Sequence, residues 1–345
     1  MSKGRVAVAM SGGVDSSLAA ALLKEAGYEV SGVYIQLWSD HSHTTSDLEH
    51  TCQILDIPLH KFNLEADFKS LVIDYFCQEY SLGRTPNPCI VCNQHIKFGF
   101  LLNRVLQMGA DYLATGHYAR VERSQNGYHL LKAVDQSKDQ SYFLYPLGQS
   151  ELQHLLLPLG NLYKGEVRRL ASKLGLPSSS RHDSQDVCFI PDNDYRSFIA
   201  KHIPLESGDI VDTEGKVLGG HKGLAQYTVG QRQGLGLASG ERLYVLKLDA
   251  ASNRLMVGTQ DQLLSNTLIA SQLSWISGEA PKEPINIMAK IRYKAPEVAA
   301  KLHPRGGVAE VNFNQPQKAI APGQAIVFYQ GDAVLGGGVI KDRVD

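Results

Sequence analysis

Residues 6–17 read VAVAMSGGVDSS, a short apolar run that leads through two glycines into a serine-rich segment. The run from Val6 to Met10 is typical of a buried strand, and helical apolar spacing follows from Ser16 to Ala26. Adjacent glycines let backbone N–H groups approach an anion closely, and the start of a helix adds the positive end of its dipole. The pattern therefore predicts a phosphate site between the first strand and the first helix of an α/β domain.

The side chains of this turn strengthen the prediction of a phosphate site. Ser11, Ser16 and Ser17 can donate hydroxyl hydrogen bonds, and Asp15 can help to hold a Mg²⁺ ion that bridges phosphates. The turn is not a Walker loop, because no Gly-Lys-Ser/Thr follows, and it lacks the spaced glycines of a dinucleotide fold. The alternative is a glycine-rich turn capped by Asp15. The preceding strand and the three serines favour phosphate.

Strand and helix signals alternate through about the first 203 residues. The elements expected after the first helix are a strand at 29–35, helices at 46–55, 67–80 and 96–108, and a strand at 111–115. Strands separated by helices predict a parallel sheet that binds ligands at the carboxyl ends of its strands.

The pattern changes after Pro204, where glycine-rich turns begin to separate short strands. From about Leu268, runs of β-branched residues between turns predict a small β barrel. We therefore expect three domains: residues 1–203 form the α/β domain, 204–266 a small central linking domain and 267–345 a C-terminal β barrel.

The charge balance excludes one class of function. The chain has 345 residues, and its 34 Lys and Arg against 35 Asp and Glu give a net charge of -1, which excludes a nucleic-acid binder that works through bulk charge. A local basic face is compatible with this balance, on a helix that carries Lys164, Arg168, Arg169 and Lys173, and an ordinary solvated face is the equal alternative. The chain has no apolar run of the roughly 18 residues that a membrane span needs and no signal-peptide pattern, so we expect a cytoplasmic protein.

The five cysteines are too few and odd in number for a disulfide scaffold. Cys52 and Cys77 lie in helix-like apolar patterns and are expected to be small core residues. Cys89, Cys92 and Cys188 lie among polar residues and prolines instead. In a reducing compartment, cysteines in such settings are catalytic, redox-active or metal-binding.

Two prolines precede the first pair of these cysteines. Pro86 and Pro88 restrict the backbone, so Cys92 is presented near the start of a helix, where a thiolate is stabilised. A zinc site would need a second close pair of Cys or His, and the sequence has none beside this pair.

Motifs along nearly the whole chain, in order, resemble the tRNA-specific 2-thiouridylase family (MnmA type) of the N-type ATP pyrophosphatases. The motifs are SGGVDS from Ser11, GRTPNP from Gly83, ATGHYAR from Ala114, KDQSYFL from Lys138, SQDVCFI from Ser184, GQRQGLG from Gly230 and PGQ from Pro322. The resemblance implies an ATP-pyrophosphatase (adenine nucleotide alpha hydrolase-like) parallel-sheet domain, followed by the central domain and the β barrel.

The resemblance also implies an activity, that of a tRNA-uridine 2-sulfurtransferase using ATP and Mg²⁺. ATP would adenylate the C2 oxygen of the wobble uridine in the tRNA anticodon loop and release pyrophosphate. A persulfide on Cys188 would then attack C2 and AMP would leave, with Cys92 transferring a proton or resolving the persulfide as a disulfide. The sulfur would come from a sulfur-relay or cysteine-desulfurase-type protein.

The family's functional residues carry over to this chain by position. Catalysis is assigned to Cys92 and Cys188. ATP binding is assigned to Ala9, Met10, Ser11, Gly12, Gly13, Val14, Asp15, Ser16, Ile35 and Gly116. Contact with tRNA is assigned to Asn87, Pro88, Cys89, His117, Lys138, Asp139, Gln140, Arg292, Tyr293 and Gln324.

One position departs from the family pattern, because many members carry Asp where this chain has Cys89. The change creates a Cys-x-x-Cys motif in addition to Cys188, so three thiolates could hold a [4Fe–4S] cluster with one open iron. Sulfide bound to that iron could then replace the persulfide as the sulfur donor. Both routes stay open from the sequence, and we favour the persulfide. An ATP-dependent amide ligase, or an RNA-binding protein without activity, would be the alternative functions.

Overall fold

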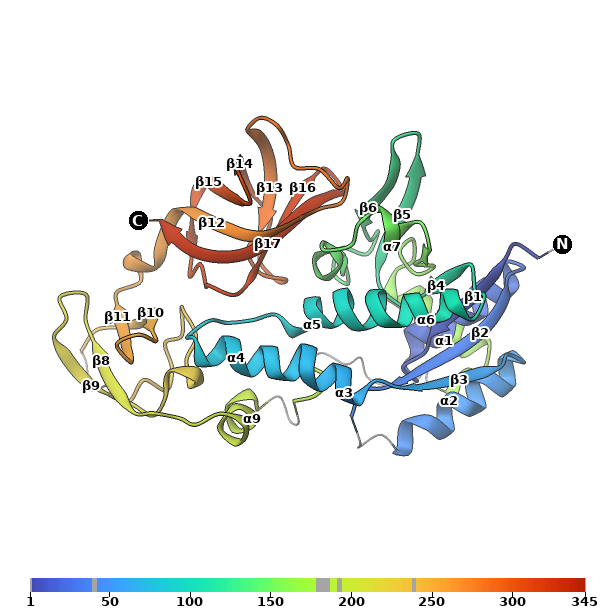
Figure 1. Cartoon of the computed structure of the whole chain (residues 1–345), viewed down its shortest axis with the longest axis horizontal. Helices are drawn as coiled ribbons and strands as arrows, with labels where there is room; N and C mark the ends of the chain where they lie inside the picture. The colour runs from blue at the N-terminus through green and yellow to red at the C-terminus, as the bar shows by residue number, and fades with distance from the viewer. Residues whose placement is uncertain (1, 39–41, 178–186, 191–193, 238–239, 345) are drawn as a thin grey trace.

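The computed structural model describes residues 2–38, 42–177, 187–190, 194–237 and 240–344. Figure 1 shows an α/β unit in blue and green, a small yellow sheet and an orange-red barrel that packs above the long helices of the α/β unit. The described part of the chain has no helix long and apolar enough to cross a membrane.

The α/β domain is built on a parallel sheet with strand order β3-β2-β1-β4-β7. Its strands are β1 (Arg5–Ala9), β2 (Glu29–Gln36), β3 (Leu59–Asn63), β4 (Tyr112–Ala114) and β7 (Leu155–Leu156). Strand β1 is central: Val6 lies opposite Val30 of β2 on one side and Tyr112 of β4 on the other. The predicted parallel sheet is confirmed.

Helices cover both faces of this sheet. On one side lie α1 (Val14–Glu25), α2 (Ser42–Leu55) and α8 (Lys164–Lys173), whereas α9 (Tyr195–His202) lies apart from them and packs its Phe198 against Phe76. One continuous helix consists of α3 (Glu65–Phe68), the π-helical η1 (Lys69–Asp74) and α4 (Tyr75–Ser81). A second consists of α5 (Pro88–Val91), the π-helical η2 (Cys92–Leu101) and α6 (Leu102–Gln107). Val8 of β1 packs toward α1 and α8, whereas Ala7 packs toward η2 and α6, so β1 is buried on both faces.

The remaining elements of the first domain form an antiparallel excursion that the sequence patterns did not predict. They are the hairpin β5 (Ala119–Ser124) and β6 (Gly127–Lys132), the short helix η3 (Ser141–Leu144) and α7 (Gln149–Leu152). The hairpin pairs with the last strand of the barrel, where Leu131 lies opposite Ala333.

The central domain and the barrel are both antiparallel or mixed β structures. The central sheet, in the order β10-β11-β8-β9, consists of β8 (Gly208–Val211), β9 (Val217–His221), β10 (Tyr244–Asp249) and β11 (Arg254–Gly258), with η6 (Leu224–Gln226) and η7 (Asp261–Leu263) beside it. The barrel consists of β12 (Leu264–Trp275), β13 (Ile285–Lys290), β14 (Val298–Arg305), β15 (Val308–Lys318), β16 (Ala325–Gln330) and β17 (Ala333–Val344). It closes because β12 pairs with both β15 and β17, which confirms the predicted C-terminal barrel.

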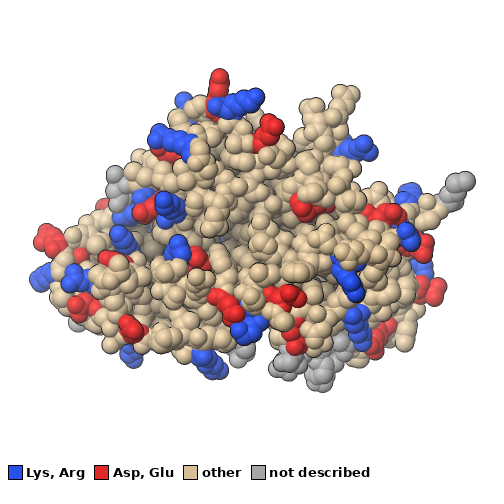
Figure 2. All heavy atoms as spheres, viewed as in Figure 1, with Lys and Arg blue, Asp and Glu red and all other residues tan. Residues whose placement is uncertain are grey.

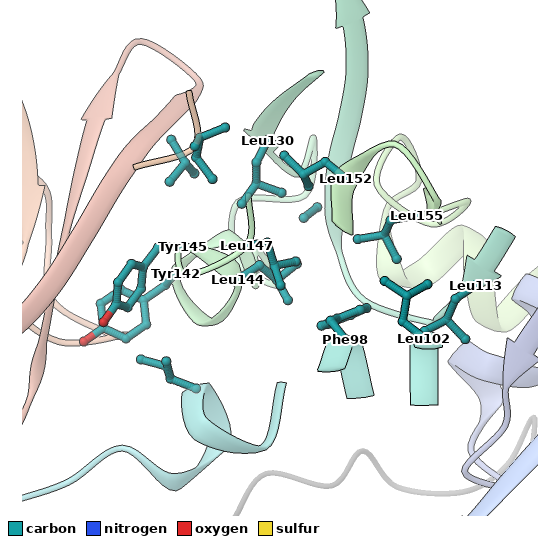
Figure 3. Packing of buried hydrophobic residues seen from close by; sticks show 14 of the residues in the cluster. Phe98, Leu102, Leu113, Leu130, Tyr142, Leu144, Tyr145, Leu147, Leu152 and Leu155 are labelled. Carbon is teal, nitrogen blue, oxygen red and sulfur yellow. The ribbon is translucent and has the colours of Figure 1, made fainter. Parts of the chain in front are cut away.

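The barrel docks on the α/β domain through a shared hydrophobic core. Figure 3 shows this core running from Leu113 and Phe98 of the α/β domain to Tyr142 and Tyr145 beside the barrel. The Tyr142 hydroxyl donates to the Ala325 carbonyl at 2.9 Å. The barrel is therefore held in one place over the α/β domain.

A largely buried ion pair reinforces this docking. Lys132 of β6 lies 2.9 Å from a carboxylate oxygen of Glu297, and the two side chains are 12% and 22% exposed. Removing the lysine alone leaves a carboxylate unpaired in a poorly hydrated place. We therefore expect Lys132→Met to lower the thermal unfolding midpoint by about 4 °C, equivalent to about 2 kcal/mol.

The controls for this prediction are a second ion pair and a double variant. Lys69 pairs with Asp74 at 2.9 Å, but both side chains are more than half exposed, so Lys69→Met should change the midpoint by less than about 1 °C. Lys132→Met combined with Glu297→Gln should recover part of the loss. Equal midpoints for the two single variants would contradict a stabilising role for the Lys132 pair.

Candidate active site

The loop between β1 and α1 is shaped by its own serines. The Ser16 hydroxyl donates to the Gly13 carbonyl at 3.1 Å and accepts from the Ser11 amide at 3.2 Å. The Ser17 hydroxyl donates to the same carbonyl at 3.0 Å. Gly12 has a φ of 78°, in the left-handed region that favours glycine. Ser16 and Ser17 therefore fix the loop, and Ser11 is its exposed hydroxyl.

A second segment closes over the start of α1. A Cβ atom on Gly116 would lie 2.8 Å from the Ser16 amide nitrogen and from the Asp15 carbonyl carbon, so only glycine fits there. Two residues later, the Tyr118 hydroxyl donates to Asp15 at 2.7 Å. The predicted ATP-binding residues of the loop and Gly116 are thus in contact, although whether they bind ATP stays a prediction.

Lys164 is the residue of this site that the sequence did not identify. Its ammonium lies 2.7 Å and 2.8 Å from the two carboxylate oxygens of Asp15, and its side chain is 11% exposed. The expectation that Lys164 belongs to a solvated basic face is therefore wrong, because the lysine points into the fold from the first turn of α8. Arg169 and Lys173 of the same helix are exposed.

The partners of Asp15 also bear on the predicted Mg²⁺ ion. Both carboxylate oxygens of Asp15 accept from Lys164, and one accepts from Tyr118 as well. A carboxylate whose oxygens are bound in this way is not arranged as a Mg²⁺ ligand. Asp15 therefore does not fit the role of Mg²⁺ ligand that the sequence predicted.

Ile35 continues the site along the neighbouring strand. It lies near the end of β2, half-buried, and packs against two of the hydrophobic clusters of the α/β domain. Met10 follows β1 and donates its amide to Val33 of β2 at 2.8 Å. These positions lie at the carboxyl ends of parallel strands, where α/β sheets bind ligands.

The predicted catalytic cysteines belong to the helix that begins with α5 and to the segment 187–190. Cys92 is buried at the start of η2, and Cys89 is half-buried one helical turn earlier. Cys188 is exposed in the segment 187–190, which Phe189 anchors through ring contacts at 5.6 Å from Phe68 and 5.5 Å from Phe76. Asp183 to Asp186, which precede Cys188 in its motif, lie outside the described residues.

The pKa of Cys188 depends on the other two thiols, and the pKa values of all three respond to Lys97. Although Cys188 is exposed as a residue, loss of hydration around its sulfur, together with Cys92 and Cys89, raises the pKa of its thiol to about 12 against the opposing effect of Lys97. Burial also raises the pKa of Cys89 and of Cys92, and Lys97 opposes that shift at both. The expected thiolate at Cys92 is therefore not favoured, because burial outweighs Lys97 and the helix start.

The three thiols do not form a metal-ligating group in the described part of the chain. No three His, Cys, Asp or Glu side chains among the described residues are arranged to hold a metal ion. The arrangement thus does not fit a [4Fe–4S] cluster held by Cys89, Cys92 and Cys188.

His117 follows Gly116 and contacts η2, the helical segment that begins with Cys92. Its Nδ1 lies 2.7 Å from the Thr115 hydroxyl, and its ring is 5.9 Å from that of Phe98. Burial, and then Lys97, lower the pKa of His117 well below its usual value, so the imidazole is neutral near pH 7. Lys97, five residues after Cys92 on the same helix, thus acts on the histidine and on all three thiols.

The predicted tRNA-contacting residues have different environments. Asn87 and Pro88 begin α5 beside Cys89, and Pro88 is buried. Asp139 is 5% exposed and accepts hydrogen bonds from the Ala133 amide at 2.9 Å and from the Ser141 hydroxyl at 2.8 Å.

Gln140 accepts from the Tyr118 amide at 3.0 Å, and Lys138, between Asp135 and Asp139, is half-buried. Asp139 and Gln140 therefore hold the loop of residues 133–141 against β5. Contacts of these residues with RNA stay predictions.

The barrel residues of the predicted site join domains together. Arg292 donates to the Ala319 carbonyl at 2.7 Å and to the Val229 carbonyl of the central domain at 3.3 Å. The Tyr293 ring lies 4.4 Å from that of Phe143. Gln324 is half-buried at the turn before β16. Each of these three lies within the fold rather than on an open basic surface. On the face in Figure 2, basic and acidic side chains are interspersed.

Comparisons with known proteins cover nearly the whole chain. Family models match as "tRNA methyl transferase HUP domain" at residues 4–192, "tRNA methyl transferase PRC-barrel domain" at 196–259 and "Aminomethyltransferase beta-barrel domain" at 265–340. The chain is 50% identical to the tRNA-specific 2-thiouridylase MnmA of Magnetococcus marinus, over 97% of this chain and 98% of that protein. Proteins of the same name from Halothermothrix orenii and Geotalea uraniireducens are 46% and 48% identical, over 98% and 99% of this chain and 99% and 96% of theirs.

The raised pKa of Cys188 leads to a test of its reactivity. Because the thiol is protonated below about pH 12, its alkylation by iodoacetamide should rise about tenfold per pH unit from about pH 8 to about pH 11. Free cysteine, with a pKa of about 8.5, should level off above about pH 9. Mass spectrometry of the Cys188 peptide measures the rate, and a plateau that matches free cysteine would contradict the raised pKa of this thiol.

Proposed function

The chain belongs to the tRNA-specific 2-thiouridylase family, and from this premise we propose that it uses ATP to replace the C2 oxygen of the wobble uridine of tRNA with sulfur. As an enzyme of this family it is a sulfurtransferase. Because tRNA is the proposed substrate, we propose the cytoplasm as its compartment.

One observation supports the proposal most directly. Two consecutive residues, Gly116 and His117, contact the phosphate loop and the cysteine-bearing helix respectively. Gly116 lies against the start of α1. Lys97 lowers the pKa of His117, and it also lowers the pKa values of Cys92 and Cys188. An activated carbonyl formed at the loop would therefore need to move little to reach a sulfur. This supports one site for activation and sulfur transfer.

The first step activates a poor leaving group. The C2 oxygen of uridine attacks the α-phosphorus of ATP, the bond to the bridging oxygen breaks, and pyrophosphate leaves. The amides of Gly12 and Gly13 and the start of α1 are suited to bind the departing anion. The oxygen then leaves C2 as AMP, which is a far better leaving group than an oxide.

The second step transfers sulfur. The terminal sulfur of a Cys188 persulfide loses its proton and attacks C2, and AMP departs with the bonding electron pair. Cys92 then gives up its proton and attacks the Cys188 sulfur. The S–S bond to the tRNA-bound sulfur breaks, and the products are 2-thiouridine and a Cys92–Cys188 disulfide that a thiol reductant must reopen. The raised pKa of the Cys188 thiol fits a cysteine that is loaded before it reacts.

The partners of this reaction are assigned by chemistry. A sulfur-relay or cysteine-desulfurase-type protein would load Cys188, which is exposed. Asn87, Pro88 and Cys89 would face the target base and His117, Lys138, Asp139, Gln140, Arg292, Tyr293 and Gln324 the rest of the tRNA. Base and sulfur meet most easily in a single-stranded loop, whose bases leave the stack at low cost. Mg²⁺ would accompany ATP, with no ligand assigned to it in this chain.

Separate measurements of activation and transfer test the proposal. Cys188→Ser should abolish 2-thiouridine formation and keep tRNA-dependent release of pyrophosphate, because Cys188 acts only after activation. Mass analysis of the wobble nucleoside and a pyrophosphate assay supply the two readouts. Cys77→Ala is the matched control, since Cys77 is buried in the same cluster as Cys92. If the control retains both activities while Cys188→Ser loses pyrophosphate release, the proposed order of steps is contradicted.

The unusual residue Cys89 distinguishes the persulfide from the iron–sulfur route. Cys89→Asp should keep most of the thiolation driven by a persulfide donor, because the thiols are not arranged as a metal group. Both proteins are purified without oxygen, and iron, labile sulfide and 2-thiouridine are measured. An iron-dependent wild-type protein whose activity is lost in Cys89→Asp would overturn the persulfide route.

A further inference from the structure

We propose that Lys164 is a phosphate-contacting residue of the nucleotide site, held there by Asp15 and Tyr118. This assignment rests on the proposed use of ATP and adds a residue to it. Lys164 is separated by 149 residues from Asp15, yet its ammonium lies 2.7 Å and 2.8 Å from the carboxylate at the start of α1. The ammonium is thus located at the anion-binding end of the phosphate loop.

The backbone of Lys164 is fixed independently of its side chain. Its amide donates to Asp135 at 2.9 Å, and Glu166 accepts from the Tyr163 amide at 2.9 Å. Val167 and Ala171 of α8 pack in the same buried cluster as the apolar face of α1. The lysine therefore enters the site from a helix that is anchored without the ion pair.

The orientation of the ammonium is fixed from two sides. The Tyr118 ring lies 5.6 Å from the Lys164 ammonium, while the hydroxyl of the same tyrosine donates to Asp15. A flexible side chain held in this way loses little further conformational freedom when a ligand binds, so its contact with an anion is less costly.

The charges of the loop require a cation at this point. A triphosphate is strongly anionic, and the Asp15 carboxylate would repel it from the start of α1. Lys164 cancels the charge of Asp15 in a position that is mostly shielded from water, where the ammonium interacts more strongly with phosphate than it would in bulk solvent. We infer that the ammonium bridges Asp15 and a nucleotide phosphate oxygen in the complex.

The test compares ATP with adenosine, since only ATP carries phosphates. Dissociation constants are measured by calorimetry for the full-length wild type and for Lys164→Met. We expect the variant to bind ATP about 10- to 100-fold more weakly, as for the loss of a charge-assisted hydrogen bond, and to bind adenosine within about twofold of the wild type. Lys164→Arg should restore part of the ATP affinity.

Two further variants guard against effects on folding. Lys24→Met removes an exposed lysine that pairs with Asp56 at the opposite end of α1 and should leave both affinities unchanged. Lys164→Met combined with Asp15→Asn removes both charges, so no unpaired carboxylate is left buried, and it should still bind ATP weakly and adenosine normally.

Each outcome decides the assignment. Wild-type ATP affinity in the double variant would overturn it, because Lys164 would then serve only to neutralise Asp15. Equal losses for ATP and adenosine in Lys164→Met would overturn it in favour of a structural role. A wild-type protein that binds adenosine and ATP equally, or neither, would instead refute the proposed function, and the role of Lys164 with it.

Discussion

The carboxylate of Asp15 is the point on which the arrangement of the site depends. It brings together the start of α1, Tyr118 from the segment after β4 and Lys164 from α8, through bonds of 2.7 to 2.8 Å. Gly116 makes this convergence possible, because any side chain there would collide with the start of α1. The glycine-rich loop is therefore not a free turn at the end of a strand. It forms one side of a site that is completed by Tyr118 and Lys164, which lie far away in the sequence.

The barrel is also held on the α/β domain by contacts between segments that are far apart in the sequence. The hairpin β5–β6 leaves the α/β domain and pairs with β17, and Lys132 at its end pairs with Glu297. On the other side, a Cβ atom on Gly323 would lie 2.9 Å from the Thr85 amide nitrogen, so the barrel approaches the segment just before Cys89 and Cys92 at backbone distance. Cys89 and Cys92 therefore lie on a helix that starts beside the barrel, and burial is the main cause that raises the pKa of both thiols.

The sequence predicted what depends on local patterns. The parallel sheet, the helices between its strands and the barrel follow from apolar periodicity and turn residues, and the structure confirms them. The role of Lys164 could not be read in this way, because its partner lies 149 residues away and its helix looks like an ordinary charged surface helix. Cys92 illustrates the same limit. Its position near a helix start is a local property that favours a thiolate, whereas its burial comes from Phe189 and other residues of a cluster assembled from remote segments. Lys97 had a local signal, since five residues from Cys92 is close to one turn of the π-helical segment, but its effect on His117 depends on the fold.

The raised pKa values of Cys89, Cys92 and Cys188 affect how readily these thiols can take part in sulfur transfer. A thiol with a pKa near 12 is almost entirely protonated at neutral pH, and so it is a poor nucleophile toward tRNA, toward ATP and toward oxidants. Lys97 opposes this protonation at Cys89, Cys92 and Cys188, but burial is the larger effect at each. In the proposed reaction, the balance between these two effects must shift before Cys92 can attack the Cys188 sulfur. His117, beside Lys97 and Thr115, is neutral but a weak base, because the same burial and the same cation hold its pKa low, so it would also need changed surroundings before it could accept a proton. In the proposed reaction, the burial of Cys92 keeps its thiol protonated until the substrate changes its surroundings, and this order would limit wasteful oxidation.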